Sequence, residues 1–103
     1  MSSLTVRTEM AKAIIARKFP TALVEIDRRL GTGLLNSPYN DIRVRQNGAT
    51  VMVVRLNGRV FPKTKVMPRT EAQRPLATQL AVDLKKAGLA NPKIEEMSRE
   101  HID

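Results

Sequence analysis

Basic side chains recur through the middle of this chain, and their chemistry suits a partner that carries phosphates. The candidates are Arg43, Arg45, Arg59, Lys63 and Lys65. Guanidinium and ammonium groups neutralise phosphates, and the release of counterions makes such binding sensitive to salt. Arginine can also bridge the two acceptors that guanine presents in the major groove. We therefore predict that these cations contact nucleic acid.

Phe61 lies among these cations, and its ring can stack on an unpaired base, so it completes the candidate site. The charge is also unevenly distributed. Residues 41–69 contain seven basic side chains and one acidic one, whereas residues 70–103 contain five basic and six acidic ones. Within a chain of net charge +8, this concentration favours an anionic partner more strongly than a high isoelectric point alone. A charged surface that only keeps the protein in solution is the alternative.

Two Asn-Gly pairs predict the element that carries these residues. Asn47-Gly48 and Asn57-Gly58 each lie between alternating apolar residues. Asn-Gly favours a type I′ hairpin turn because both central positions need a positive φ. We therefore expect a three-stranded antiparallel β-meander. Its strands are expected at residues 42–46, 49–56 and 59–62.

Because side chains alternate between the two faces of a strand, the turns also predict the faces of this meander. Val44 should lie opposite Val51, which makes one face apolar and suited to a cover of helices. On the other face the cations surround Met52, Val54 and Phe61. This second face can bind nucleic acid. Alternatively, these three apolar residues form a patch for a second copy of the chain or for an acidic protein partner.

Helical periodicity and end signals predict four helices around the meander. They are expected at residues 5–18, 20–30, 70–88 and 91–97. Gly88 should end the third helix in a left-handed conformation, with Leu89 placed for a Schellman contact. The predicted fold is a single α+β domain over residues 1–103, of order α-α-β-β-β-α-α, with the helices on one face of the sheet. The tail, residues 98–103, is expected to fray.

Composition narrows the chemistry further. The chain has no cysteine, and its one histidine, His101, lies in the tail, so we expect no metal site, no cofactor and no catalytic triad. No apolar run approaches the roughly 20 residues of a membrane span. The first residues also lack the apolar core of a signal peptide. We expect a cytoplasmic protein that does not contact a membrane.

The part of the chain from the meander to Asp83-Leu-Lys-Lys-Ala-Gly-Leu89 resembles small domains of the double-stranded-RNA-binding type, including messenger-RNA interferase toxins. The resemblance to the toxins would imply a histidine in the early strands, and residues 1–100 contain none. The predicted sheet with its helix is also similar to the arm-site DNA-binding domains of tyrosine integrases. Each likeness covers less than half of the chain without a diagnostic motif, so neither assigns a family.

The leading hypothesis is a small, non-enzymatic nucleic-acid-binding regulator or accessory protein, with either DNA or RNA as its partner. The rival is a protein-interaction module that uses the same sheet face, through Met52, Val54 and Phe61. A small basic chain without cysteine also suits an accessory protein of a phage or another mobile element.

Overall fold

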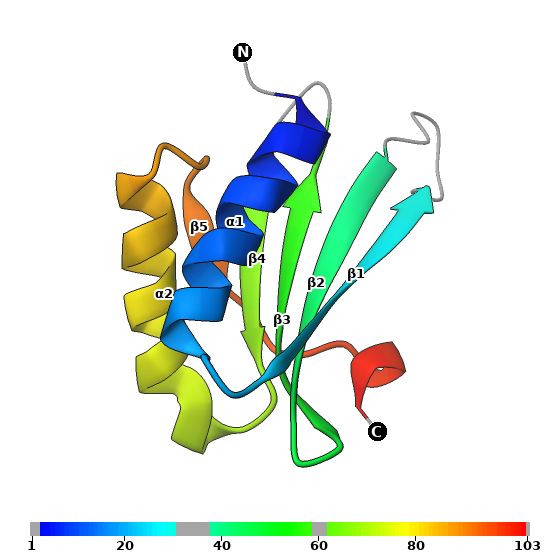
Figure 1. Ribbon diagram of the computed structural model, residues 1–103, viewed down its shortest axis with the longest axis vertical. Helices are drawn as coiled ribbons and strands as arrows, with labels where there is room; N and C mark the ends of the chain where they lie inside the picture. Colours follow the sequence, from blue (N-terminus) through cyan, green and yellow to red (C-terminus); the bar gives the residue numbers. More distant parts are fainter. Residues whose placement is uncertain (1–2, 31–37, 59–61, 103) are drawn as a thin grey trace.

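Two helices and five strands make up the fold in the computed structural model, which describes residues 3–30, 38–58 and 62–102 (Figure 1). The helices are α1 (Leu4–Lys18) and α2 (Arg74–Lys86). The strands are β1 (Leu23–Leu30), β2 (Pro38–Gln46), β3 (Ala49–Asn57), β4 (Lys63–Pro68) and β5 (Pro92–Ile94). There are also two short 3-10 helices. The first, η1 (Glu71–Gln73), directly precedes α2, and the second, η2 (Arg99–His101), lies near the end of the described chain.

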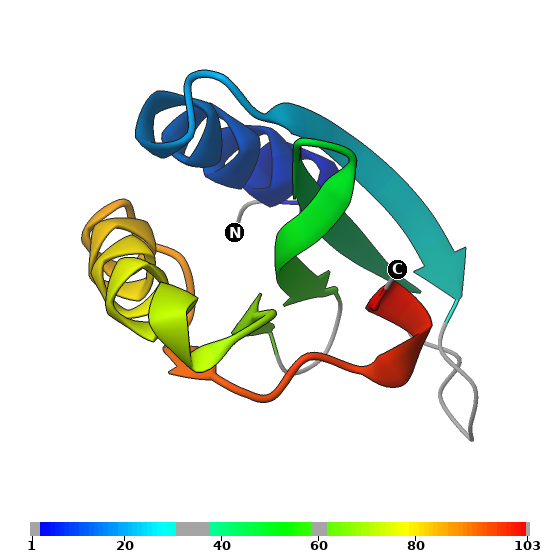
Figure 2. The same ribbon diagram turned by 90° about the horizontal axis from the view of Figure 1, so that it is seen from below.

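The strands form one sheet in the order β1-β2-β3-β4-β5. The first four are antiparallel, and β5 lies parallel to β4 because α2 carries the chain back across the sheet. Both helices lie on one face, while the segment after β5 passes over the opposite face, here called the back face (Figure 2). The predicted α+β class is therefore confirmed. The predicted element order and the sheet of only three strands are wrong.

Residues 23–30 form strand β1, not the predicted second helix. Val24 and Ile26 alternate with the acidic residues Glu25 and Asp27, which is the period of a half-buried strand. Val24 and Ile26 pack against the core, and Leu23, which a helical stripe would bury, is exposed. The short segment allowed both periods, and pairing with β2 selects the strand.

The turn at Asn47-Gly48 is confirmed, with φ of 53° and 80° at its two residues. However, a β-bulge between Val44 and Arg45 shifts the register of β2 on β3 by one residue. Val44 therefore pairs with Met52 instead of Val51. A slip of one residue moves every following side chain to the other face. The predicted faces of β3 are consequently wrong.

The shift brings Met52 and Val54 onto the helix-covered face, where both are fully buried. They cannot form the exposed patch that the rival hypothesis requires. The third predicted strand, 59–62, lies mainly outside the described residues. The segment from Lys63 to Pro68, which lies beyond the predicted meander, is strand β4.

The ends of both helices follow local rules. Ser3 caps α1 by accepting a hydrogen bond from the Val6 amide at 3.2 Å. At the end of α2, Gly88 has φ of 96°, and the Leu89 amide donates to the Leu84 carbonyl at 3.1 Å. This is the predicted Schellman motif. The fourth predicted helix is wrong, because residues 92–94 add strand β5 to the sheet.

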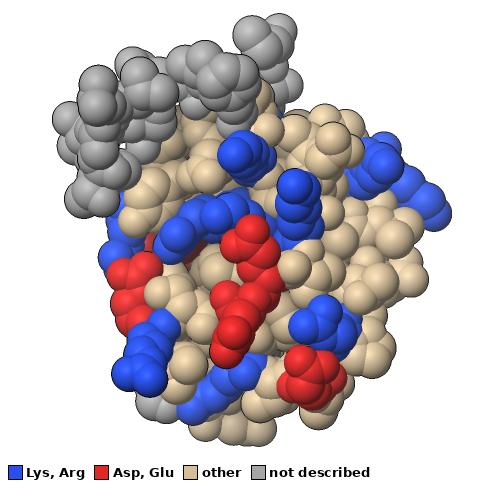
Figure 3. Space-filling model, turned by 180° about the vertical axis from the view of Figure 1, so that it is seen from behind, with Lys and Arg blue, Asp and Glu red and all other residues tan. Residues whose placement is uncertain are grey.

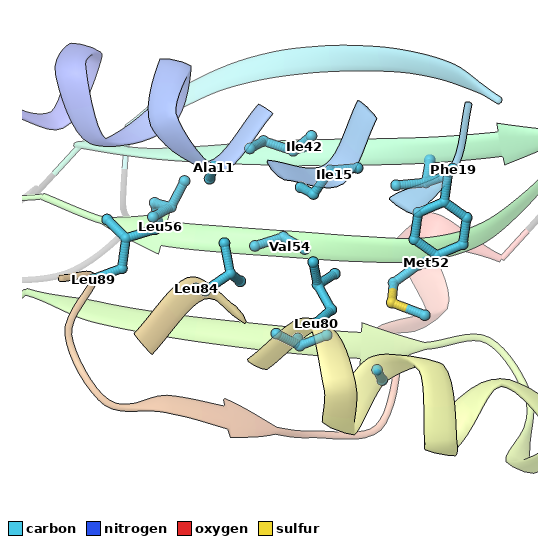
Figure 4. Close-up of a cluster of buried hydrophobic side chains, with 13 residues drawn as sticks. Ala11, Ile15, Phe19, Ile42, Met52, Val54, Leu56, Leu80, Leu84 and Leu89 are labelled. Atoms are coloured by element: carbon cyan, nitrogen blue, oxygen red, sulfur yellow. The ribbon is translucent and has the colours of Figure 1, made fainter. Parts of the chain in front are cut away.

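The main core lies between the helices and the sheet (Figure 4). Leu80 and Leu84 of α2 and Ile15 of α1 cover Val54 of the central strand, and all four are fully buried. A smaller cluster of Val53, Met67 and Met97 lies separately from this core. No helix among the described residues is long and apolar enough to cross a membrane.

Candidate nucleic-acid interface

Arg43 and Arg45 lie on the back face, as predicted, but carboxylates of β1 contact both. Arg43 is 3.7 Å from Asp27, and Arg45 is 3.9 Å from Glu25. Arg45 also donates to the Gly48 carbonyl at 3.1 Å. Sequence reasoning missed these partners because it assigned β1 to a helix. The two arginines are thus less available to a phosphate than the sequence suggested.

Lys63 and Lys65 also lie on the back face, on β4, and Lys93 of β5 joins them. Lys65 pairs in register with Lys93 across the two parallel strands. Lys63 lies two residues before Lys65, so it shares the same face. Glu95 contacts Lys65 at 3.4 Å, while Lys63 and Lys93 are exposed. We call Lys63, Lys65 and Lys93 the β4–β5 lysine cluster.

Arg59 and Phe61, the other two predicted site residues, lie outside the described residues. The structure therefore brings together only part of the predicted site. Lys93 was missed because the signal at Asn91-Pro92 was interpreted as a helix start, although Pro also suits the first residue of an edge strand.

A buried network at the centre of the back face was not predicted. Asp41 of β2 is fully buried, and Arg55 of β3 donates two hydrogen bonds to its carboxylate, at 2.7 and 2.9 Å. These bonds raise the pKa of Arg55 above its usual value. The guanidinium also lies 4.5 Å from the centre of the Tyr39 ring, within cation–π distance.

His101 extends this network from the tail, where sequence reasoning expected fraying. Its side chain is fully buried, and its Nε2 lies 3.0 Å from Asp41 Oδ2. Its Nδ1 lies 3.3 Å from Nη2 of Arg43. Nη2 of Arg55 lies 3.4 Å from Nε2 of the same ring. Through these contacts His101 fastens the tail to β2.

Asp41, Glu100 and His101 place three possible metal ligands within 4.8 Å of one another. The guanidinium of Arg55 already lies among them. Its Nη2 is 2.9 Å from Asp41, 3.2 Å from Glu100 and 3.4 Å from His101. An internal cation thus takes the position that a metal ion would need, so the arrangement is a structural ion network.

The space-filling view of the back face shows carboxylates interspersed with the cations (Figure 3). Glu95, which follows β5, and Glu100, near the end of the described chain, supply two of the contacting carboxylates, to Lys65 and to Arg55. The central part of this face is therefore nearly compensated in charge. Lys63 and Lys93 are exposed and form no ion pair with a carboxylate of the described residues, and they lie at the β4–β5 edge of this face.

A second basic region lies in a groove of about 450 Å³ between the two helices. Arg17, Lys18 and Lys86 line it together with Asp83. Lys18 contacts Asp83 at 2.9 Å, and this hydrogen bond lowers the pKa of Asp83. All three cations lie in the last turns of their helices, where the negative ends of the helix dipoles attract them. That structural role accounts for the cations without a ligand.

Comparison with protein-family models, with curated proteins and with solved structures gives no match. The function is therefore inferred from the residues and their geometry.

Proposed function

We propose that this chain is a basic, non-enzymatic nucleic-acid-binding protein, and that the β4–β5 lysine cluster is its contact with phosphates. One observation carries the proposal: Lys63 and Lys93 are exposed, and no carboxylate of the described residues forms an ion pair with either one. They flank Lys65, whose partner is the single carboxylate of Glu95. The cluster therefore keeps an excess of positive charge at one edge of the sheet.

The strand geometry gives these cations a regular spacing. Lys65 lies two positions after Lys63 on β4, a distance of about 6.6 Å along the strand, and adjacent strands lie about 4.8 Å apart. Lysine binds phosphate as a flexible point charge and reads no base, so we expect contacts to the backbone and little dependence on sequence. Such a role suits an accessory protein.

The test is fluorescence anisotropy with labelled duplex DNA, single-stranded DNA and RNA at two salt concentrations. We expect binding that weakens with salt. The double variant Lys63→Gln/Lys93→Gln should bind more weakly, and its log–log salt slope should fall in magnitude by about 2, because two phosphate contacts are lost.

The matched control is Lys12→Gln/Lys85→Gln, which makes the same change in net charge on the two helices. Its affinity should stay within about twofold of the original protein if the cluster is specific. An equal loss in both double variants would show that net charge alone drives binding. That outcome would overturn the proposed site.

A further inference from the structure

The C-terminal segment, residues 95–102, crosses the back face as an acidic tail (Figure 2). It carries three carboxylates, those of Glu95, Glu96 and Glu100, against the one guanidinium of Arg99. The tail starts where β5 ends, at the β4–β5 lysine cluster, and runs toward β1. It therefore lies over the strands that carry the arginines predicted to bind nucleic acid.

The carboxylates of this tail contact cations from three different strands. Glu100 lies 3.4 Å from Arg29 of β1 and 3.2 Å from Arg55 of β3. Glu95 lies 3.4 Å from Lys65 of β4. Each of these contacts pairs an anion with a guanidinium or ammonium group, which is the interaction that a backbone phosphate would make.

Beneath the tail the sheet itself is positive. Its cations outnumber its carboxylates by five to three. The cations are Arg29, Arg43, Arg45, Arg55 and Lys65, and the carboxylates are those of Glu25, Asp27 and Asp41. The tail adds a net negative charge and so neutralises this surface, which is continuous with Lys63 and Lys93.

The tail is held by few apolar contacts. Met97 packs with Val53 and Met67 in a cluster of three buried residues, and His101 provides the second anchor. Segments with few buried apolar contacts open locally at a lower free-energy cost than the core. Most of the contacts that hold the tail are instead ion pairs, which another anion can replace.

We infer that the acidic tail is an internal competitor for nucleic-acid phosphates: its carboxylates occupy Arg29, Arg55 and Lys65, and displacing it opens a larger phosphate-binding surface across the back face. This inference rests on the proposed function and adds a regulation to it. A nucleic-acid strand first contacts the β4–β5 lysine cluster and then replaces the tail. The apparent affinity is lowered by the fraction of molecules in which the tail stays docked.

Two variants loosen the tail by different means, and a third serves as the control. Met97→Ala removes an apolar anchor without changing the net charge. Glu100→Gln removes the tail carboxylate that contacts Arg29 and Arg55. Glu96→Gln makes the same change in net charge as Glu100→Gln, at an exposed residue that forms no ion pair with the described residues. Each variant is measured by anisotropy with a labelled single-stranded DNA oligonucleotide.

We expect Met97→Ala and Glu100→Gln to raise the affinity about threefold to tenfold, because the docked tail no longer competes as strongly. Glu96→Gln should raise it by less than about twofold. If all three variants bind alike, or if Met97→Ala gives no gain, the tail does not compete. If labelled polyglutamate binds the loosened variants as tightly as the oligonucleotide does, the exposed surface recognises acidic peptides, and the nucleic-acid assignment is overturned.

Hydrogen exchange gives a second readout that needs no variant. The His101 amide donates to the Ser98 carbonyl, and the Ile102 amide donates to the Arg99 carbonyl. Saturating oligonucleotide should speed exchange at both amides if it displaces the tail, while unchanged or slower exchange would overturn the inference. The lysine variants, with their tail intact, test the contact site separately. The inference about the tail can therefore fail while the proposed contact site stands.

Discussion

The two faces of this sheet are covered in different ways. On one face, α1 and α2 bury a continuous cluster of apolar side chains. On the back face, the tail covers an ion network around Asp41, and among the described residues a small separate cluster of three buried apolar side chains lies there. The same strands supply both faces, because Val54 and Arg55 are neighbours on β3 and point in opposite directions.

This difference assigns different roles to the two faces: one stabilises the fold, and the other carries the charged groups. Apolar burial is non-directional and grows with the area removed from water, so the helix-covered face supplies most of the free energy of folding. Charged groups contribute only when each is paired, and a pair can be exchanged for another ion of the same sign. We therefore expect the largest loss of stability from substitutions in the apolar core, and a smaller loss where a buried charge on the back face is left unpaired. Substitutions in the tail should mainly change local order and binding.

The largest effect is expected at Leu80. Its side chain is fully buried between α2 and the sheet (Figure 4), so Leu80→Ala removes apolar contacts and leaves a cavity. We expect a loss of about 3 kcal/mol in the free energy of unfolding. Urea denaturation followed by circular dichroism measures it. The exposed Leu76 of the same helix is the control, and Leu76→Ala should cost less than about 1 kcal/mol.

This core was only partly predictable from the sequence. The glycine end of α2 follows local rules and is confirmed, and Ala77, Leu80 and Leu84 of its apolar stripe are buried, whereas Leu76 is exposed. The register of β3 does not follow such rules, because Val51, Met52, Val53 and Val54 are all apolar and suit either face. The bulge at Val44 and Arg45 decides between the two registers, and nothing in the alternation marks its position.

The next largest effect is expected at Arg55. Arg55→Met leaves the buried carboxylate of Asp41 without its main partner, although His101 still contacts it. We expect a loss of about 2 to 3 kcal/mol, measured by the same denaturation experiment.

Removing both charges tests the reason for this loss. The double variant Asp41→Asn/Arg55→Met should recover at least about half of it, because no unpaired charge then remains buried. If the double variant is as unstable as Arg55→Met, the loss comes from the packing of Arg55 on Tyr39. It does not then come from burying the Asp41 carboxylate without a charged partner.

The candidate site was predictable to the extent that its residues lie on neighbouring strands. Lys63 and Lys65 were predicted, and Lys93 became their neighbour only through the parallel pairing of β5 with β4. The partners of Arg43 and Arg45 come from β1, whose short segment satisfied a helical period as well. His101 is buried by contacts with residues about 60 positions earlier, and local pattern does not report contacts of that separation.

A smaller effect is expected at Met97, the apolar anchor of the tail. Met97→Ala should lower the global free energy of unfolding by about 1 kcal/mol, less than Leu80→Ala does, because its cluster has two other members and can open locally. Amide exchange in residues 98–102 should accelerate by a larger factor than exchange in β3. Equal acceleration in both would show that the tail unfolds together with the main core. The two faces would then differ in the types of residue they carry but not in their local stability.

The smallest effect is expected at an ion pair in the helical layer. Lys18 and Asp83 are 2.9 Å apart, nearly as close as Arg55 and Asp41, but both are partly open to water. The hydrogen bond from Lys18 lowers the pKa of Asp83 below its ordinary value of 3.8, so the unfolded state binds a proton more readily. The resulting stabilisation is complete well above pH 3.8, and it is lost as the pH falls through the lowered value.

Asp83→Asn should therefore lower the urea midpoint of unfolding slightly at neutral pH. It should also reduce the decrease of this midpoint at acidic pH, which we call the acid limb. Lys18→Met should reduce the acid limb in the same way. Glu71→Gln, which breaks the more exposed pair with Arg74, is the control and should leave the acid limb unchanged. If Asp83→Asn keeps the full acid limb, this pair contributes nothing measurable to stability. If its effect instead matches that of Arg55→Met, burial does not decide how much an ion pair stabilises this protein. The difference proposed between the two faces of the sheet would then be wrong.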